Sequence, residues 1–455
     1  MKSNNINNLK TNSDTINNSL LQNIIWFLMA IISLIHGLLC ISPGILSSYI
    51  TELKKEFKLS DEKYGHLGTA YGLGSLLGSL IFTFIIQILN NKYLICGMIM
   101  INCLCNFIFF FNITYRILLS SRFISGFASV FCFIYFPIWV ERFAIKLWVN
   151  FMQTTVQVAN TIGNILGYFI YLILGSNKWK DGFFIESFSI LFLVLIMLMI
   201  PSRYYNKKYS NKNNNEVTVT DTSGIKDLRL NDELKDSIFK EIICNFPFIM
   251  IVLYRANRIF IFQALNFWFS DYLQNSLFVK DPQTIFWSYS ITMVFSSLFG
   301  NILGGIVINK IGGTRSKFSF IAMGILQLLS VLFGVFSPIT NSVLYFTILM
   351  SLYILLNSAS GIISISATFS VVPEKLDGPA NGIYSFIVNL IGFLPAPYFY
   401  SILKKIFKKE SHAILLLMFY GFIGCIELFG ADIYMRAKKI KLYRKNIFTF
   451  REENK

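Results

Sequence analysis

Long runs of uncharged, apolar residues recur along nearly the whole 455-residue chain, from about residue 24 to about residue 435. A helix that crosses a bilayer needs about 20 such residues. The runs are continuous rather than alternating, which excludes an outer-membrane β-barrel. Only 14% of the residues are charged, whereas soluble domains usually have about 25%. The chain therefore has too few charged residues to cover the surface of a soluble protein. The sequence therefore predicts an all-α membrane protein. Twelve spans are predicted: 24–50, 64–90, 93–112, 117–141, 148–174, 183–201, 246–273, 284–308, 317–338, 342–371, 381–403 and 411–435.

The seven cysteines and three histidines give no sign of a cofactor. No CxxC pair occurs, and the number of cysteines is odd, so neither a disulfide framework nor a metal site is predicted. Motifs of nucleotide-binding, serine-hydrolase and zinc-protease sites are absent from the sequence. We therefore expect neither an enzyme nor direct ATP drive.

The net charge of +16 could indicate a nucleic-acid partner, but in a membrane protein basic loops facing anionic lipid explain it better. Lys and Arg number 25 in the two tails and the even-numbered loops, counting Lys317 at the start of the ninth span, and 12 in the odd-numbered loops. The positive-inside rule thus predicts both termini in the cytosol. The membrane is either the plasma membrane or an internal, vacuolar or lysosome-like one. We expect membrane lipids as partners, no nucleic acid, and a monomer.

The longest polar connection divides the spans six and six. The predicted domains are a disordered cytosolic tail (1–23), a first six-helix bundle (24–201), a cytosolic linker (202–245), a second bundle (246–435) and a basic tail (436–455). A weak internal repeat supports a duplication, because Ser75, Leu76 and Gly78 coincide with Ser297, Leu298 and Gly300 after a shift of 222 residues. Duplicated carriers bind substrate near the midplane, between their repeats.

Two motifs resemble those of the major facilitator superfamily. The stretch Gly304-Gly305-Ile-Val-Ile-Asn309-Lys310-Ile-Gly312-Gly313-Thr-Arg315 is similar to the loop motif of that family, with Asn309 in place of its acid. Arg122-Phe-Ile-Ser-Gly126 is similar to the family's Arg-x-x-x-Gly motif. The resemblance implies two pseudo-symmetric six-helix bundles and transport by alternating access. It also implies a gating role for Gly305, Asn309, Lys310, Gly312 and Arg315.

Within that superfamily, the chain looks most like the Spinster branch. Pro137-Ile-Trp139-Val-Glu141-Arg142-Phe, Ala264-Leu-Asn-Phe-Trp268 and Pro395-Ala-Pro397 carry this likeness. The first span departs from that branch, because it has His36 and Ser42-Pro43-Gly44 where an Asp-Arg pair is usual. The bias toward Asn and Lys resembles that of proteins from AT-rich protozoan genomes, such as those of malaria parasites.

Three ionisable residues lie in the middle of predicted spans. Arg255 and Arg258, spaced by three, share one face of the seventh span. Charges inside a bilayer usually face a cavity or a partner, so the pair is either a clamp for an anionic substrate or part of an internal ion pair. His36 coincides with Arg258 after the 222-residue shift. It could exchange a proton or simply hydrogen-bond to a neighbouring helix.

Polar stripes mark two further spans. Gln153, Gln157, Asn160 and Asn164 fall on one face of the fifth span, and Asn381, Ser385 and Asn389 on one face of the eleventh. Such stripes either line an aqueous route or join helices. Gln157, Asn160 and Asn389 are the predicted substrate contacts among them. Arg122 and Glu141 flank the fourth span and are expected either to couple protons, together with His36, or to form an ion pair.

These residues indicate a secondary transporter or uniporter for a small organic, anionic solute, with a proton as its possible symport partner. The Spinster likeness allows a second carrier function, for lysophospholipids or sphingoid lipids. A non-transporting membrane receptor or scaffold is the third alternative, since the loop around Gln87 to Lys92 in the first half lacks the family's motif.

Overall fold

The computed structural model describes residues 22–85, 89–111, 114–143, 148–175, 178–205, 242–311, 318–339, 341–372, 377–407 and 409–438. The described regular structure is helical throughout, with no strand in these ranges. Two compact units form, one from residues 1–52 and 73–209 and the other from residues 53–72 and 210–455. Each unit is described by itself below.

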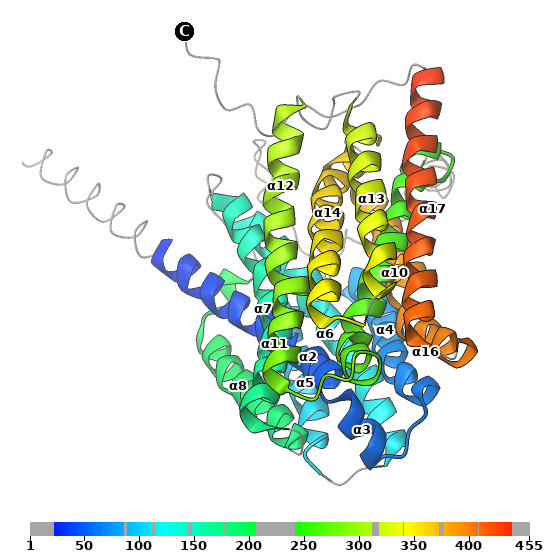
Figure 1. Ribbon diagram of the computed structural model, residues 1–455. Coiled ribbons are helices and arrows are strands. Elements are labelled where there is room, and N and C mark those ends of the chain that lie inside the picture. Colours follow the sequence, from blue (N-terminus) through cyan, green and yellow to red (C-terminus); the bar gives the residue numbers. More distant parts are fainter. Residues whose placement is uncertain are drawn as a thin grey trace, which may run out of the picture. The chain divides into compact units, whose positions relative to one another are not determined.

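The first unit contains the span Gln22–Ser48, which ends in helix α2 (Ile41–Ser48). It continues with α5 (Asn91–Ile108), α6 (Tyr115–Phe143), α7 (Val149–Leu174), α8 (Trp179–Met199) and the 3-10 turn η2 (Ser202–Tyr204). Two helices, α3 (Ile50–Glu56) and α4 (Asp61–Ile85), carry the boundaries between the units. Within the first unit, α2 packs on α7 and α8, while α5 packs on α6 and α8 (Figure 1).

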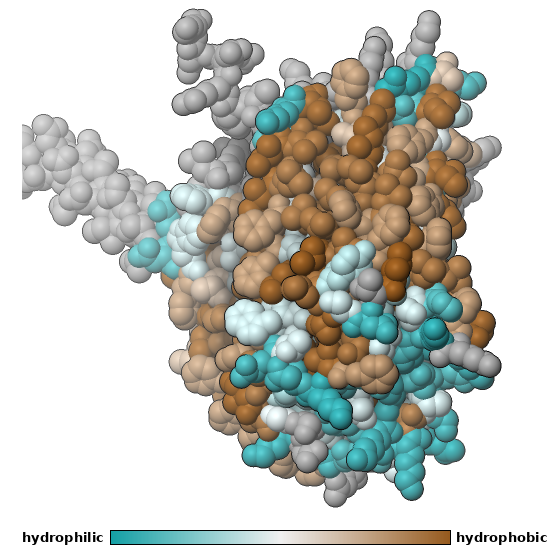
Figure 2. Space-filling model, in the orientation of Figure 1, coloured by the Kyte–Doolittle hydropathy of each residue, from teal (hydrophilic) through white to brown (hydrophobic). Residues whose placement is uncertain are grey.

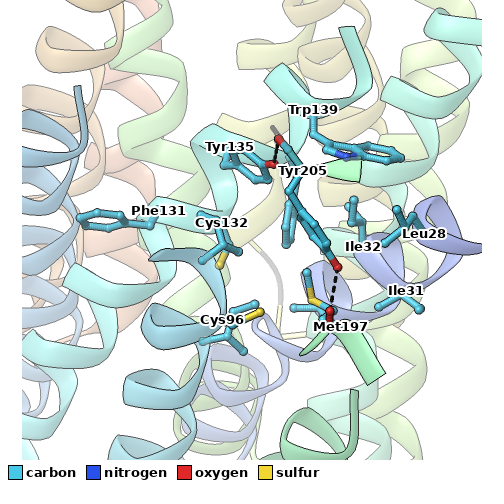
Figure 3. Packing of buried hydrophobic residues seen from close by; sticks show 14 of the residues in the cluster. Leu28, Ile31, Ile32, Cys96, Phe131, Cys132, Tyr135, Trp139, Met197 and Tyr205 are labelled. Atoms are coloured by element: carbon cyan, nitrogen blue, oxygen red, sulfur yellow. Dashed lines mark hydrogen bonds between the residues drawn. The ribbon is translucent and has the colours of Figure 1, made fainter. Parts of the chain in front are cut away.

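The chain that follows α8 folds back onto the core of the first unit, where Figure 3 shows Tyr205 beside Tyr135 and Met197. The Tyr205 hydroxyl donates to the Met197 carbonyl oxygen at 3.2 Å, and the Tyr135 hydroxyl donates to the Tyr205 carbonyl oxygen at 2.9 Å. The indole nitrogen of Trp139 donates to the Tyr204 carbonyl oxygen at 2.9 Å. Trp139 belongs to the motif that begins at Pro137, so this motif holds the chain that leaves the last helix of the unit.

The second unit contains α10 (Phe246–Asn275), α11 (Pro282–Tyr289), α12 (Ser296–Lys310), α13 (Ser319–Phe336), α14 (Val343–Ser370), α15 (Asp377–Ile387), α16 (Ala396–Ile406) and α17 (Glu410–Ala437). A 3-10 turn, η6 (Ser337–Ile339), follows α13. Helix α14 packs between α12 and α13, and α17 packs on α10 and α13 (Figure 1).

Two π-helical turns interrupt spans of the second unit. One, η5 (Ser290–Phe295), joins α11 to α12, and the other, η8 (Val388–Phe393), joins α15 to α16. In η8 the Leu394 amide donates to the Asn389 carbonyl oxygen, five residues earlier, at 2.9 Å. Since π-turns occur mostly as short insertions in helices and frequently at functional sites, η8 is a place to look for function.

Among the described residues, ten helices are long and apolar enough to cross a membrane. The other two predicted spans, 64–90 and 148–174, coincide with α4 and α7, and α7 includes the shorter apolar helix Val158–Leu174. Figure 2 shows apolar side chains over the outer faces of α12, α13 and α17, with polar residues gathered toward their ends. Exposed side chains on these faces include Phe299, Ile302, Ile325, Leu328, Ile423 and Ile426. The predicted all-α membrane architecture is confirmed.

The two halves repeat a contact that the sequence repeat indicated. Gly78 of α4 lies against the Phe127 backbone of α6, and Gly300 of α12 lies against the Leu355 backbone of α14. A methyl group at either glycine would overlap the facing backbone. Since these are the second and fourth spans of each half, the match between residues 75–78 and 297–300 corresponds to the same helix-helix approach in each unit.

Candidate functional site

Arg255 lies inside the second unit, where it is 6% exposed. Its guanidinium carbon lies 4.3 Å from the centre of the Tyr384 ring of α15, a cation–π contact. Its Nε has no hydrogen-bond partner among the described residues. The ring orients the guanidinium but does not neutralise it, so the charge remains available to an anion.

Arg258 lies one helical turn further along α10 and reaches α14. A methyl group built on Gly361 would stand 2.5 Å from Nη1 of Arg258 and 2.6 Å from its guanidinium carbon. Gly361 thus leaves the space that the guanidinium fills. Neither Arg255 nor Arg258 forms an ion pair with another described side chain, and the Nε atoms of both lack a hydrogen-bond partner there.

The face of α14 that carries Gly361 is polar and buried. Tyr353, Asn357 and Gly361 are spaced by four and share this face. Tyr353 is 0% exposed and Asn357 is 1% exposed. The Tyr353 hydroxyl and both amide atoms of Asn357 have no hydrogen-bond partner in the described part of the chain.

A hydrogen-bonded group of side chains lies beside this face, toward α13. The Tyr254 hydroxyl lies 2.6 Å from the Ser360 hydroxyl and donates to Gln327 at 3.2 Å. The Ser360 hydroxyl donates to the Met323 carbonyl oxygen at 3.2 Å. Tyr254 and Ser360 are therefore fixed by the protein itself, whereas Tyr353 and Asn357 beside them keep unused polar atoms.

Asn389, a predicted substrate contact, stands in the π-turn η8 and is half-buried. Gly392 of the same turn packs against the Ala256 backbone, next to Arg255 in sequence. The structure thus brings the eleventh span to the predicted arginines through Tyr384 and Gly392. The side chain of Asn381 lies outside the described set.

His36 belongs to the first unit, where it is 3% exposed. Its ring lies 4.9 Å from the Phe133 ring and 5.9 Å from the Phe136 ring, both of α6, between ring centres. Nδ1 has no hydrogen-bond partner among the described residues. The ring contacts of this histidine in the described part of the chain are aromatic. Its pairing with Arg258 stays a prediction.

Arg122 lies with an acid that the sequence analysis did not select. It is 2% exposed, its Nη1 donates to the Ser42 hydroxyl at 3.3 Å, and it interacts electrostatically with Glu186 of α8. Glu186 is 0% exposed and accepts a hydrogen bond of 2.9 Å from the Asn106 amide. The side chain of Glu141 is not among those described, so its pairing with Arg122 remains a prediction.

The polar stripe of the fifth span follows α7. Asn160 and Asn164 are half-buried, and the Asn164 amide donates to the Asn160 carbonyl oxygen at 3.2 Å. Gly163 beside them lies directly against the Gly37 backbone. This part of the stripe thus lies beside a close contact with the first span, and the substrate contact of Asn160 stays a prediction. The side chains of Gln153 and Gln157 fall outside the description, so the predicted contact through Gln157 is untested.

The predicted gating residues lie in the second half of α12 and beyond its end. Asn309 and Lys310 form its last turn and are exposed, and Gly305 has no atom within 4 Å of a methyl group built on it. Gly312 and Arg315 fall outside the described residues. The loop motif therefore remains a prediction about this helix end.

A buried ion network in the second unit was missed by the sequence analysis. Asp271 of α10, with a side chain 1% exposed, binds Lys54 of α3 at 2.6 Å through one oxygen and Lys404 of α16 through the other. Asp61 of α4 binds the same lysines at 2.6 and 3.2 Å. Lys404 also binds Glu410 at 2.8 Å.

Aromatic contacts support this network. The Nζ atoms of Lys54 and Lys404 lie 5.4 and 5.0 Å from the Trp268 ring centre, and the Trp268 indole donates to the Pro397 carbonyl oxygen at 2.9 Å. Burial raises the pKa of Asp61, but Lys404 and Lys54 outweigh it, so its pKa lies below the ordinary value of 3.8. These contacts hold residues 53–72 against α10 and α16. In the sequence, only the motifs that contain Trp268 and Pro397 marked this region as distinctive.

Comparison with known proteins agrees with this architecture. No curated protein matches the chain by sequence. A bacterial homologue of the human lysosomal transporter Spinster, in an inward-facing and occupied conformation, has a TM-score of 0.72 at 13% identity, over 90% of this chain and 96% of that one. A D-xylose-proton symporter gives 0.68 at 13% identity, over 90% and 97% of the two chains.

The nucleoside transporter NupG gives a TM-score of 0.66 at 15% identity, over 89% of this chain and 98% of its own. At such identities these likenesses establish the fold. The model of the Major Facilitator Superfamily matches residues 27–397, which include the buried arginines, the polar face of α14 and most of the ion network. The chain is a multi-pass membrane protein with the fold of a transporter, and it belongs to the Major Facilitator Superfamily.

Proposed function

We propose that this protein is a secondary transporter that moves a small organic anion across a membrane by alternating access. The observation that carries the proposal is the pair Arg255 and Arg258, which lies in the middle of α10 without an ion pair among the described residues. A charged side chain at mid-membrane costs about 2.5–3.5 kcal/mol on insertion scales. A negative group on the substrate would offset this cost at the time of binding.

Arginine suits such a role because its planar guanidinium binds a carboxylate or phosphate through two parallel hydrogen bonds. Tyr384 fixes the plane of one guanidinium and Gly361 makes room for the other. The two cations therefore occupy defined positions before a substrate arrives, which lowers the ordering cost of binding.

The ion network supports the alternating part of the mechanism. Residues 53–72 lie in sequence between two stretches of the first unit but pack with the second. Under the predicted orientation, with both termini cytosolic, this segment lies at the outer end of the spans. We infer that its release from Asp271 and Lys404 opens that end, and that its return closes it.

In this scheme, residues of the first unit bind the proton that is coupled to transport. Glu186 and Arg122 form a buried acid-base pair with Ser42. The Asn106 amide nitrogen donates both to Glu186 and to the Asn102 side-chain oxygen. His36 lies six residues before Ser42 in the same span. A proton taken up by Glu186 would leave Arg122 without its negative partner, which is the type of charge change that biases a two-state transporter.

Flux into proteoliposomes tests the proposal. Organic anions, nucleosides, sugars and lysophospholipids are offered as radiolabelled substrates to the purified protein. We expect uptake of anions, abolished in Arg258→Ala and reduced at least tenfold in affinity in Arg258→Lys, which keeps the charge but loses the planar fork. Transport of lysophospholipid alone would favour the lipid carrier, and absence of any flux would favour the receptor.

A glycine substitution provides an independent check on the site. Gly361→Ala places a methyl group on the Arg258 guanidinium without removing any charge, so it should weaken anion transport. Gly430→Ala is the matched control, because a methyl group there has no atom within 4 Å. Equal transport by the two variants would show that anion transport does not depend on the position of the Arg258 guanidinium.

A further inference from the structure

We propose that the substrate of this site is a hydroxycarboxylate, and that Asn357 and Tyr353 bind its hydroxyl group while Arg258 binds its carboxylate. This inference rests on the proposed function, since it assigns a substrate class to the same arginine site. It starts from α14, which carries three neighbouring positions on one face, Tyr353, Asn357 and Gly361.

Asn357 lies on α14 between Gly361, which Arg258 contacts, and Tyr353, with which Arg258 interacts electrostatically. The Arg258 guanidinium fills the space above Gly361, one turn after Asn357. Its charge also acts on the Tyr353 ring, one turn before Asn357. The carboxamide between these two positions therefore stands beside the cation.

Burial makes the unused atoms of this face significant. Asn357 is 1% exposed and Tyr353 is 0% exposed. A buried donor or acceptor left without a partner costs about 1–3 kcal/mol, and here the Asn357 oxygen, the Asn357 nitrogen and the Tyr353 hydroxyl all lack one among the described residues. The neighbouring hydroxyl groups of Tyr254 and Ser360 do have partners, since they lie within hydrogen-bond distance of each other.

The chemistry of these atoms selects the ligand. A carboxamide offers one acceptor and two donor hydrogens, and a hydroxyl group both donates and accepts. A ligand hydroxyl can therefore bond to the oxygen and the nitrogen of Asn357, or to one of them and to Tyr353. With Arg258 adjacent, the complete ligand has a carboxylate and a hydroxyl group on nearby carbons.

Such a site should discriminate strongly. A protein group built to hydrogen-bond a ligand hydroxyl is left unpaired by the analogue that lacks it, and the analogue is rejected accordingly. We expect hydroxylated acids to bind at least tenfold more tightly than their deoxy analogues. A buried water on Asn357 would satisfy the same atoms without any such preference.

The test compares matched acids on purified full-length protein. Dissociation constants are measured by thermal shift for L-lactate against propionate, L-malate against succinate, and 3-hydroxybutyrate against butyrate. The wild type should prefer the hydroxylated member of at least one pair tenfold or more. Asn357→Leu and Tyr353→Phe should reduce that preference to about one while retaining binding of the deoxy acid. Tyr353→Phe removes a single oxygen, so it keeps the test valid if Asn357→Leu fails to fold.

The outcomes separate the two proposals. Equal affinity for both members of every pair, or a preference that persists in both variants, overturns the hydroxyl contact and leaves the anion site standing. Failure of every acid to bind the wild type overturns the hydroxycarboxylate class. If the acids bind but Arg258→Lys binds them as tightly as the wild type, the arginine site itself is wrong.

Discussion

The guanidinium of Arg255 lies against the face of the Tyr384 ring, with 4.3 Å between its central carbon and the ring centre. This contact joins α10 to α15 within the second unit. Through the π-turn η8, α15 continues into α16, which carries Lys404 of the ion network. The proposed substrate arginine and the proposed outer closure are thus connected along a single span.

Tyr384→Leu should weaken binding of the anionic substrate by about 2- to 30-fold, because a cation–π contact is worth about 0.5–2 kcal/mol and its loss lets the Arg255 guanidinium adopt other orientations. Tyr384→Phe keeps the ring and should bind almost as tightly as the wild type. Dissociation constants from thermal shift provide the measurement. An equal loss in both variants would assign the effect to the hydroxyl group instead of the ring face.

Asp271 should be the most sensitive member of the ion network. Removing one partner of a buried pair typically costs about 3–5 kcal/mol because the other charge stays buried and unpaired. Asp271→Asn should therefore lower the melting temperature, and a double-mutant cycle with Lys404→Ala should show strong coupling. Lys405→Ala is the control, since the Lys405 pair with Glu62 is exposed, with Lys405 at 71%. Additive effects of the Asp271 and Lys404 changes would contradict a shared network.

Stability should depend on Asp61 in a defined pH range. Its folded-state pKa lies below the ordinary 3.8, so the folded state binds fewer protons there than the unfolded state. The stability gained from ionised Asp61 is present above about pH 4 and is lost as pH falls through the folded pKa. The melting temperature of wild type should therefore exceed that of Asp61→Asn at pH 7, and this difference should shrink below about pH 4. A difference independent of pH would argue against the ion pair.

Tyr205→Phe should destabilise the first unit modestly. The change removes the hydrogen bond to the Met197 carbonyl oxygen that Figure 3 shows. Such a bond contributes about 0.5–1.5 kcal/mol to stability. Tyr93→Phe serves as control, because Tyr93 is 62% exposed and Phe keeps the ring beneath Lys92. Unfolding monitored by tryptophan fluorescence should separate the two variants. Identical curves would mean that water replaces the Tyr205 bond.

The spans could be predicted because bilayer thickness fixes their length and composition. Hydropathy predicts the ends of the spans less accurately than their number. For example, α8 begins at Trp179 rather than near residue 183. In the predicted span 183–201 Glu186 is the fourth residue, whereas in α8 it is the eighth, where it is buried and interacts with Arg122. The two central arginines could be found from their charge alone, since few charges occur at mid-span.

Other parts of the site depend on contacts between distant residues. Nothing in the sequence connects Lys54 with Asp271, which are 217 positions apart. Asn357 looked like an ordinary polar residue in an apolar span, because only burial reveals that its amide atoms lack partners. The role of Gly361 likewise follows from the Arg258 side chain that lies above it.

The continuous path from Tyr384 through η8 to Lys404 has a thermodynamic consequence. If a bound anion changes the equilibrium between held and released states of residues 53–72 by some factor, that equilibrium must change the affinity for the anion by the same factor. Asp271 contributes no group to the arginine site, yet its substitution would then alter the dissociation constant of the substrate. Affinity in this carrier would be a property of the ion network as much as of the residues that touch the cargo.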